Sequence, residues 1–376
     1  MPPNIHTSPA AKTLTVPFSL QKFLGNPNIK DVQCVGSYNR IPARRPTIMV
    51  PGLPRVWTRL VPPFSIVSDP NLRQTERRMP PFIRSMPFHS LMCAIDAKKL
   101  DSIPWSSVDF VTDCGTLRRL LEVVNASTDR KELRLVLQVV GQHTILLNDS
   151  PSQTNPIVKK DNAVRQDKDS FGYSFEMATT TMPLGGGGAS KYYRILQYVF
   201  GDLRMIVRAE VDACLSVREQ ISPSESTPSK DVAGLRIIAG GTHVPQESIL
   251  ELKSRSGKNQ RHSTLKSHFF PQLFFSHTSN LIEGAHTDGT VSDIRHHDFS
   301  GEMEPPPESR SHDRLCVLVA ALKLLQETAI SRSRSVRKGR LVVVFHGKQL
   351  TVYDPQGVDG LLPQAIVKKF WPRGPT

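Results

Sequence analysis

The sequence predicts an α+β fold with a mixed central β-sheet flanked by helices, and three observations lead to this prediction. Short apolar, β-branched runs of strand length recur along the chain, such as Leu133–Val140 and Leu203–Asp212. Between them lie segments with leucines at helical spacing, such as Thr116–Asn125. Strands and helices alternate through one continuous unit, so we expect a single domain over residues 37–376. Residues 1–36 are rich in Pro and Ser, so we expect them to form a flexible arm.

Local patterns place the individual elements. Helices are expected at His89–Ala97, Thr116–Asn125, Phe269–Phe275, Asp313–Ala329 and Leu361–Trp371. Strands are expected at Val108–Thr112, Leu133–Val140, Thr144–Leu147, Tyr192–Phe200, Leu203–Asp212, Ser248–Lys253, Asn280–His286, Leu341–Phe345 and Leu350–Tyr353. Short turns join three successive pairs of these strands, which are therefore expected to form antiparallel hairpins.

The charge balance favours a polyanionic partner. The 376-residue chain carries a net charge of +14 with a pI near 9.7, and such a surface attracts phosphates. The alternative is a basic surface with no specific partner. Arginines of the proline-rich N-terminal region, such as Arg55, are interpreted as part of a solvated face.

Other classes are not favoured. No apolar run approaches the roughly 20 residues of a membrane-spanning helix, and the N-terminus has no secretory apolar core, so an intracellular protein without a membrane segment is expected. The five cysteines are scattered and form no C-x-x-C pair, which indicates reduced thiols rather than disulfides or zinc ligands.

Two charged triplets at strands carry the candidate chemistry. Glu210-Val211-Asp212 and Glu251-Leu252-Lys253 each place two charged side chains on one side of a strand. Together with Glu176 they would supply hard oxygen ligands for Mg²⁺ or Mn²⁺, beside a lysine. The alternative is a set of strand-end charges that meet solvent in weak surface ion pairs.

Their order along the chain resembles the decapping exoribonuclease family of RNA 5′-end quality-control enzymes. Gly172-Tyr173-Ser174-Phe175-Glu176 and the two triplets match that family's G-Φ-x-Φ-E, E-Φ-D and E-Φ-K motifs. Gln272 matches the glutamine of K-Φ-x-x-Q, and Gly284 matches the glycine of G-Φ-R.

The resemblance implies a PD-(D/E)xK nuclease-like core, a divalent-metal-dependent hydrolase activity on RNA 5′ ends (decapping, pyrophosphohydrolase or 5′-3′ exonuclease) and a nuclear location. It assigns the roles as follows: metal ligands Glu176, Glu210, Asp212 and Glu251; catalytic lysine Lys253; and Gln272 near the attacking water. RNA 5′ ends or nucleotides are the expected partners. The arginine-rich run Arg332–Arg340 adds weak support for the nucleus.

The chain departs from the family's pattern at three positions that would bind substrate phosphates. Cys114 and His286 stand where the family has arginines, and His268 stands where it has a lysine. A non-catalytic RNA- or protein-binding relative is therefore the alternative. The whole chain is most similar to a fungal branch often labelled geranylgeranyl pyrophosphate synthase, but it has none of the D-D-x-x-D motifs that a prenyl synthase requires.

Overall fold

The protein is described by a computed structural model. It describes residues 14–17, 23–69, 86–98, 103–126, 132–149, 170–186, 188–217, 229–256, 265–307, 309–333, 340–346, 349–353 and 360–372; at 14–17 and 265–268 the backbone alone is described. Among these residues no helix is long and apolar enough to cross a membrane.

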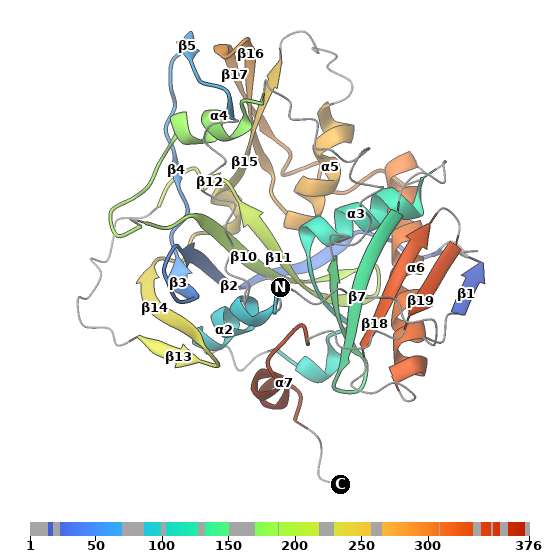
Figure 1. The fold of residues 1–376 in the computed structure, drawn as a ribbon. Coiled ribbons are helices and arrows are strands. Elements are labelled where there is room, and N and C mark those ends of the chain that lie inside the picture. Colours follow the sequence, from blue (N-terminus) through green and yellow to red (C-terminus); the bar gives the residue numbers. More distant parts are fainter. Residues whose placement is uncertain are drawn as a thin grey trace.

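The described strands form two mixed sheets (Figure 1). The larger sheet has twelve strands in the order β1 (Leu14–Pro17), β19 (Gln349–Tyr353), β18 (Arg340–His346), β7 (Glu132–Val140), β8 (Thr144–Asp149), β6 (Phe110–Asp113), β11 (Leu203–Val211), β10 (Lys191–Phe200), β2 (Ile29–Ile41), β3 (Thr47–Gly52), β14 (Leu235–Gly241) and β13 (Lys230–Val232). The smaller has seven, in the order β5 (Phe64–Ser65), β17 (Thr290–Asp298), β16 (Asn280–Thr287), β15 (Ile249–Ser256), β12 (Ala213–Cys214), β4 (Val56–Trp57) and β9 (Thr180–Thr181).

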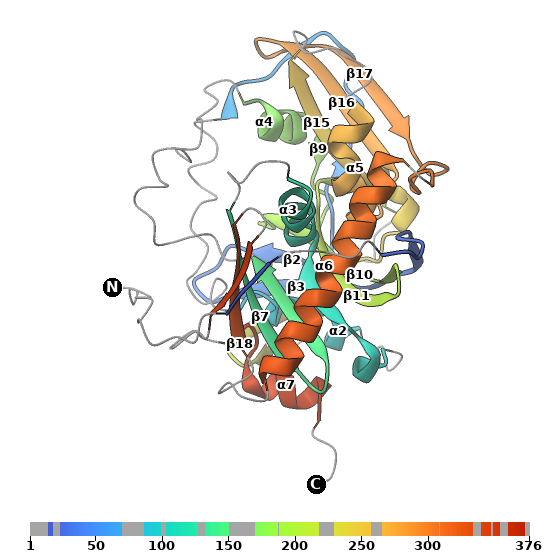
Figure 2. The ribbon, with the colours of Figure 1, turned by 90° about the vertical axis from the view of Figure 1, so that its right-hand side faces the viewer.

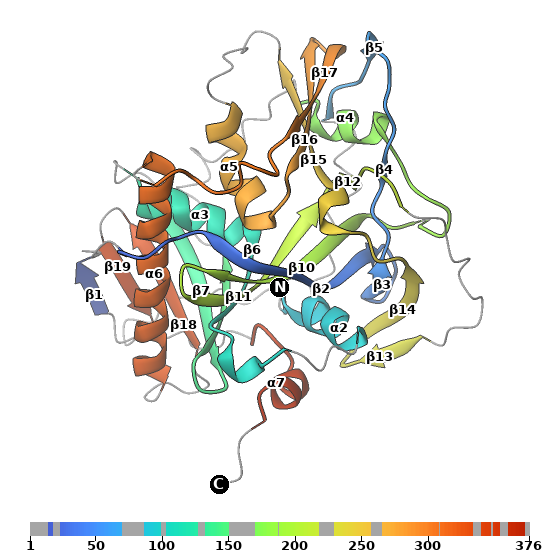
Figure 3. The same cartoon turned by 180° about the vertical axis from the view of Figure 1, so that it is seen from behind.

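Helices cover both faces of the larger sheet because its central strands are apolar on both sides. Along β11, Met205 and Val207 enter one core cluster and Ile206, between them, enters another. The first cluster packs under α3 (Cys114–Val124), α5 (Leu265–Ser276) and α6 (Arg310–Ser333), and the second under α2 (His89–Ala97) and α7 (Gln364–Phe370). Figure 3 shows α6 running along the back of the molecule.

The smaller sheet is also covered by helices. It stands above the larger sheet in Figure 1, with α4 (Gly172–Ala178) on one side and α5 on the other, and the view turned by 90° shows the same arrangement (Figure 2). Leu250 and Leu252 of β15 pack with Phe175 of α4 in an apolar cluster of their own. Glu251, which lies between these two leucines, therefore lies on the opposite face of the strand.

The α+β prediction and most element positions are confirmed. The pairs β7–β8, β10–β11 and β18–β19 are antiparallel, as expected from their short turns. The arm predicted over residues 1–36 ends earlier, however, because β2 begins at Ile29 and pairs with both β10 and β3. Most residues before position 23 lie outside the described part of the chain.

Candidate active site

Helix α4 carries Glu176 to the region where the two sheets meet. Phe175 is fully buried and anchors this helix against β16 at Gly284. A Cβ atom at Gly284 would lie 2.3 Å from the Phe175 ring, so only glycine leaves room for that side chain. Two residues of the sequence motifs thus hold the helix that presents Glu176.

Asp69, from the proline-rich N-terminal region, caps the start of α4. Its carboxylate accepts hydrogen bonds from the backbone N–H groups of Tyr173 at 3.2 Å and Ser174 at 3.0 Å, and from the Ser170 hydroxyl at 2.7 Å. The side chain is fully buried. These bonds satisfy N–H groups that the first turn of a helix leaves without partners, and they fix the direction of α4.

We predict that Asp69→Ala lowers both stability and metal affinity. Loss of a helix cap costs about 0.5–2 kcal/mol of unfolding free energy, and loss of a residue that orients a metal ligand weakens metal binding by about 10–100-fold. Urea denaturation and Mn²⁺ titration calorimetry measure the two effects. Asp69→Asn keeps one carbonyl acceptor and should retain most of both. Unchanged Mn²⁺ affinity in Asp69→Ala would mean that the cap does not control Glu176.

Asp212 lies at the crossing from one sheet to the other, since β11 ends one residue before it and β12 begins one residue after it. Its Oδ2 accepts a hydrogen bond of 2.9 Å from the backbone N–H of Leu252 on β15. Glu210, two residues earlier, forms an ion pair with Lys191 of β10, with 2.7 Å between Oε1 and Nζ, and its side chain is 48% exposed. The first triplet is therefore tied to the second through Asp212.

Glu251 is the most deeply buried carboxylate of the site, at 3% exposure. Lys253 Nζ and Gln272 Nε2 both donate hydrogen bonds to its Oε1. Burial, reinforced by the charge of Asp212, raises the pKa of Glu251. Burial alone would lower the pKa of Lys253, but the charges of Glu251 and Asp212 outweigh it and the pKa is raised.

Four carboxylates influence one another at this site, and we call Glu176, Glu210, Asp212 and Glu251 the carboxylate row. Burial raises the pKa of Glu176, and the charges of Asp212 and Glu210 raise it further. The charge of Asp212 raises the pKa of Glu251 as well, so Asp212 acts on both Glu176 and Glu251. Among the described residues no three Asp, Glu, His or Cys side chains are gathered closely enough to hold a metal ion. Glu210 forms its ion pair with Lys191 instead.

The donor set nevertheless fits a divalent cation. Carboxylate oxygens without His or Cys are the ligands that Mg²⁺ and Mn²⁺ prefer. Burial first, and neighbouring carboxylates second, raise the pKa values of Glu176 and Glu251, and a divalent ion would offset the repulsion between these carboxylates. To join such a site, Glu210 would exchange Lys191 for the ion.

We predict that the metal-free protein loses stability as pH rises. Raised carboxyl pKa values mean that the folded protein binds more protons than the unfolded chain above pH 4.5, the ordinary glutamate value, so unfolding free energy falls with rising pH. Added Mn²⁺ should reverse this fall, because metal binding displaces those protons. Thermal unfolding at pH 5.5 and 8.0, with and without Mn²⁺, measures both effects. A Glu176→Gln/Glu251→Gln variant should show a flatter pH dependence, and an equally steep one would contradict the assignment.

Cys114, His286 and His268, the three departures from the family pattern, have different surroundings in the fold. Cys114 is buried, and burial raises the pKa of its thiol to about 12, so the thiol is protonated. Its Sγ lies 3.8 Å from the Gln272 carbonyl oxygen. His286 packs on Phe171 with ring centroids 4.7 Å apart, on the α4 side of the smaller sheet, and burial lowers its pKa. The side chain of His268 lies outside the described residues.

Arg55 is more than a solvated arginine, contrary to the interpretation from sequence. Its guanidinium donates to the Thr180 hydroxyl at 2.6 Å and to the Thr180 carbonyl oxygen at 2.9 Å, just beyond the end of α4. Its charge lowers the pKa of Glu176, partly offsetting the effect of burial. The error arose because residues 55 and 180 meet only in the fold, and no local pattern marks such a pair.

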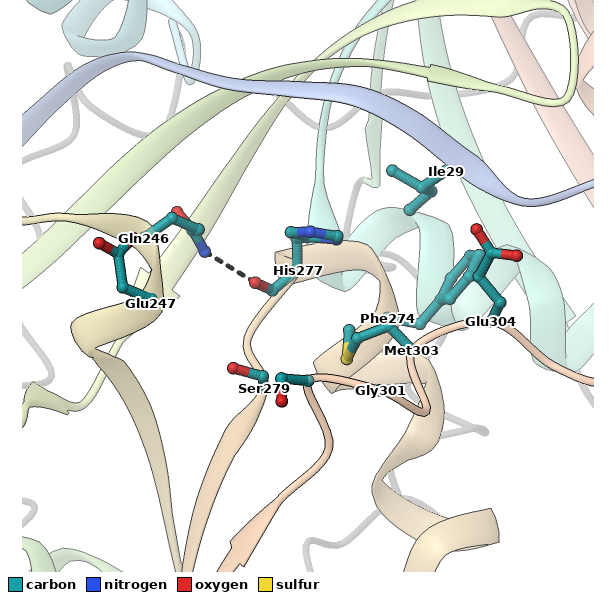
Figure 4. A pocket seen from close by; sticks show the side chains of 10 residues that line it. Ile29, Gln246, Glu247, Phe274, His277, Ser279, Gly301, Met303 and Glu304 are labelled. Atoms are coloured by element: carbon teal, nitrogen blue, oxygen red, sulfur yellow. Dashed lines mark hydrogen bonds between the residues drawn. The ribbon is translucent and has the colours of Figure 1, made fainter.

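A separate cavity of about 470 Å³ contains none of the predicted site residues (Figure 4). It lies at the C-terminal end of α5, and Phe274, His277, Glu247 and Glu304 are among the residues that line it. The Gln246 amide donates to the His277 carbonyl oxygen at 2.8 Å. The candidate chemistry therefore belongs to the carboxylate row.

The fold of this chain, with a group of carboxylates and a lysine where two mixed sheets meet, is similar to the folds of solved Rai1 and Dxo1 structures. S. pombe Rai1 in complex with 3′-FADP is 13% identical with a TM-score of 0.58, over 91% of this chain and 98% of that one. C. albicans Rai1 in complex with pU5-Mn²⁺ is 14% identical with a TM-score of 0.59, over 96% and 98%. K. lactis Dxo1 in complex with manganese is 11% identical with a TM-score of 0.56, over 92% and 98%.

These likenesses confirm the fold that the sequence motifs implied. The model of one protein family, described as a domain of unknown function (DUF8563), matches residues 28–371, so the chain belongs to that family. No curated protein matches the sequence.

Proposed function

We propose that this protein is a divalent-metal-dependent phosphodiesterase that acts on RNA 5′ ends, by decapping, pyrophosphohydrolysis or 5′-3′ exonuclease cleavage. The observation that carries the proposal is the hydrogen-bonded group of Glu251, Lys253 and Gln272 on this fold, with the charge of Asp212 acting on both Glu251 and Glu176. The Rai1 and Dxo1 structures with pU5-Mn²⁺ and manganese support the same chemistry.

The residues have distinct roles in this proposal. Glu176, Asp212 and Glu251 would hold Mg²⁺ or Mn²⁺, with Glu210 as a further ligand. A bound divalent ion supplies Lewis-acid activation of a water and of the phosphate. The Lys253 ammonium, fixed by Glu251, would neutralise negative charge that develops on the phosphate.

Gln272 would orient the attacking water from the α5 side. Its Nε2 donates to Glu251, which leaves its amide oxygen available to accept from a water molecule. Both Lys253 and Gln272 are therefore placed by the same buried carboxylate, so the geometry of the reacting groups depends on Glu251.

A non-catalytic RNA- or protein-binding relative is the second candidate. It is favoured by one specific observation: Cys114 and His286 are buried and uncharged, so neither supplies a cation to a phosphate. In that case the carboxylate row would persist without substrate turnover.

The deciding experiment is incubation of purified protein with 5′-monophosphate, 5′-triphosphate and capped RNAs in Mn²⁺, and separately in Mg²⁺. A Glu210→Ala/Asp212→Ala variant serves as the control. Nucleotide release by the wild type alone is expected. No release, or equal release by both proteins, would contradict the enzyme and leave the binding relative as the better description.

We also propose a nuclear location, on the basis of the family resemblance. Residues 334–339 of the arginine-rich run lie outside the described residues. A fluorescent fusion, with and without arginine-to-alanine changes in that run, tests the location. A diffuse cytoplasmic signal from the intact chain would contradict it.

A further inference from the structure

Helix α3 presents an arginine to the candidate active site. Arg118 lies one helical turn after Cys114, so the two residues share a face of α3. Cys114 contacts the carbonyl oxygen of Gln272, whose side chain donates to Glu251. The charge of Arg118 also opposes the rise in the pKa of both Cys114 and Lys253, as expected of a nearby cation.

Two other guanidiniums of this region already have carboxylate partners. Arg208 forms a bidentate ion pair with Asp113, with N–O distances of 2.6 and 2.8 Å. Arg119 forms an ion pair with the buried Asp149. Within the described part of the chain, Arg118 has neither a hydrogen bond nor an ion pair. It is half-buried, so part of its side chain remains open to a ligand.

We propose that Arg118 binds a phosphate group of the RNA at the candidate active site. A guanidinium offers a planar pair of N–H donors that matches two phosphate oxygens, and this pairing gains strength where solvent is partly excluded. Arg118 supplies from the next turn of α3 the cation that Cys114 lacks. This inference rests on the proposed function and names the residue that determines recognition of a phosphorylated substrate.

The test is direct binding rather than turnover. A fluorescent 5′-phosphorylated oligouridylate is titrated with protein in Ca²⁺, and anisotropy gives Kd over a series of salt concentrations. Arg118→Ala is expected to raise Kd by about 10–100-fold and to reduce the slope of log Kd against log salt by about 0.7, the value for one phosphate contact on a single strand. Arg118→Lys keeps the positive charge but lacks the planar pair of N–H donors, so its Kd should lie between those of the wild type and Arg118→Ala.

Arg236→Ala removes one exposed arginine from β14, at the far end of the larger sheet, and is the charge-matched control. It should change Kd less than twofold. Equal Kd and equal salt slope for the wild type and Arg118→Ala would overturn the inference while the proposed function stands. No binding by the wild type, together with no nucleotide release, would contradict the proposed function and this inference with it.

Discussion

Glu251→Gln is expected to reduce the rate of RNA 5′-end hydrolysis by about a thousandfold or more. The substitution preserves shape but removes the charge that would hold a divalent ion, and such an ion contributes several kcal/mol to the transition state, at about 1.4 kcal/mol per tenfold in rate. The same buried oxygen holds Lys253 and Gln272, so their placement is weakened too. Single-turnover kinetics in Mn²⁺ measure the effect.

The stability of the metal-free Glu251→Gln variant should not fall with its hydrolysis rate. Burial and the charge of Asp212 disfavour the ionised form of Glu251, so a neutral glutamine removes an unfavourable interaction from the metal-free protein. We expect a melting temperature no lower than that of the wild type. Glu247→Gln, an exposed carboxylate on the same segment, is the control and should alter neither quantity. Hydrolysis by Glu251→Gln at the wild-type rate would exclude this residue as a metal ligand.

Lys253→Met is expected to lower the hydrolysis rate by about 10²–10³-fold, the usual effect of losing one donor aimed at developing negative charge. The methylene stem is kept, so packing near Phe269, whose ring centroid lies 6.0 Å from Nζ, changes little. Mn²⁺ affinity should fall far less than the rate, which distinguishes this variant from Glu251→Gln.

The control for Lys253→Met is Lys230→Met, which removes a lysine that is 69% exposed on β13. It should leave both rate and metal affinity unchanged. If Lys253→Met instead lost metal binding and activity in equal proportion, Lys253 would act by placing Glu251, and a direct role at the phosphate would be contradicted.

Local sequence patterns were enough to predict amphipathic helices and hairpins between strands that are adjacent in the sequence. The β10–β11 pair has its register from Phe200↔Leu203 to Tyr192↔Val211, as its short turn requires. The leucines of α3 and α6 recur at helical spacing and are buried as expected.

Arrangements that join distant segments were beyond local patterns. β6 pairs in parallel with β11, and β15 with β16, across long stretches of chain. The division into two sheets, with Asp212 at the crossing, depends on these pairings and on β2 entering the larger sheet at Ile29. Propensity and periodicity report which face of a strand is apolar, and they contain no information about which strand lies beside it.

For the candidate site, the sequence by itself proposed the carboxylates, the lysine and the glutamine. The spacing within the two charged triplets places side chains on one face, and the ordered motifs resemble those of a known family. Only the tertiary structure decided what surrounds them: Asp69 at the start of α4, Arg55 beyond its end, and Arg118 without a partner in the described residues. The physical reason is that charge and hydrogen-bonding partners are chosen by proximity in space. Asp69 and Ser174 are 105 residues apart in the chain, yet the Ser174 backbone N–H donates to Asp69 Oδ1 at 3.0 Å in the fold.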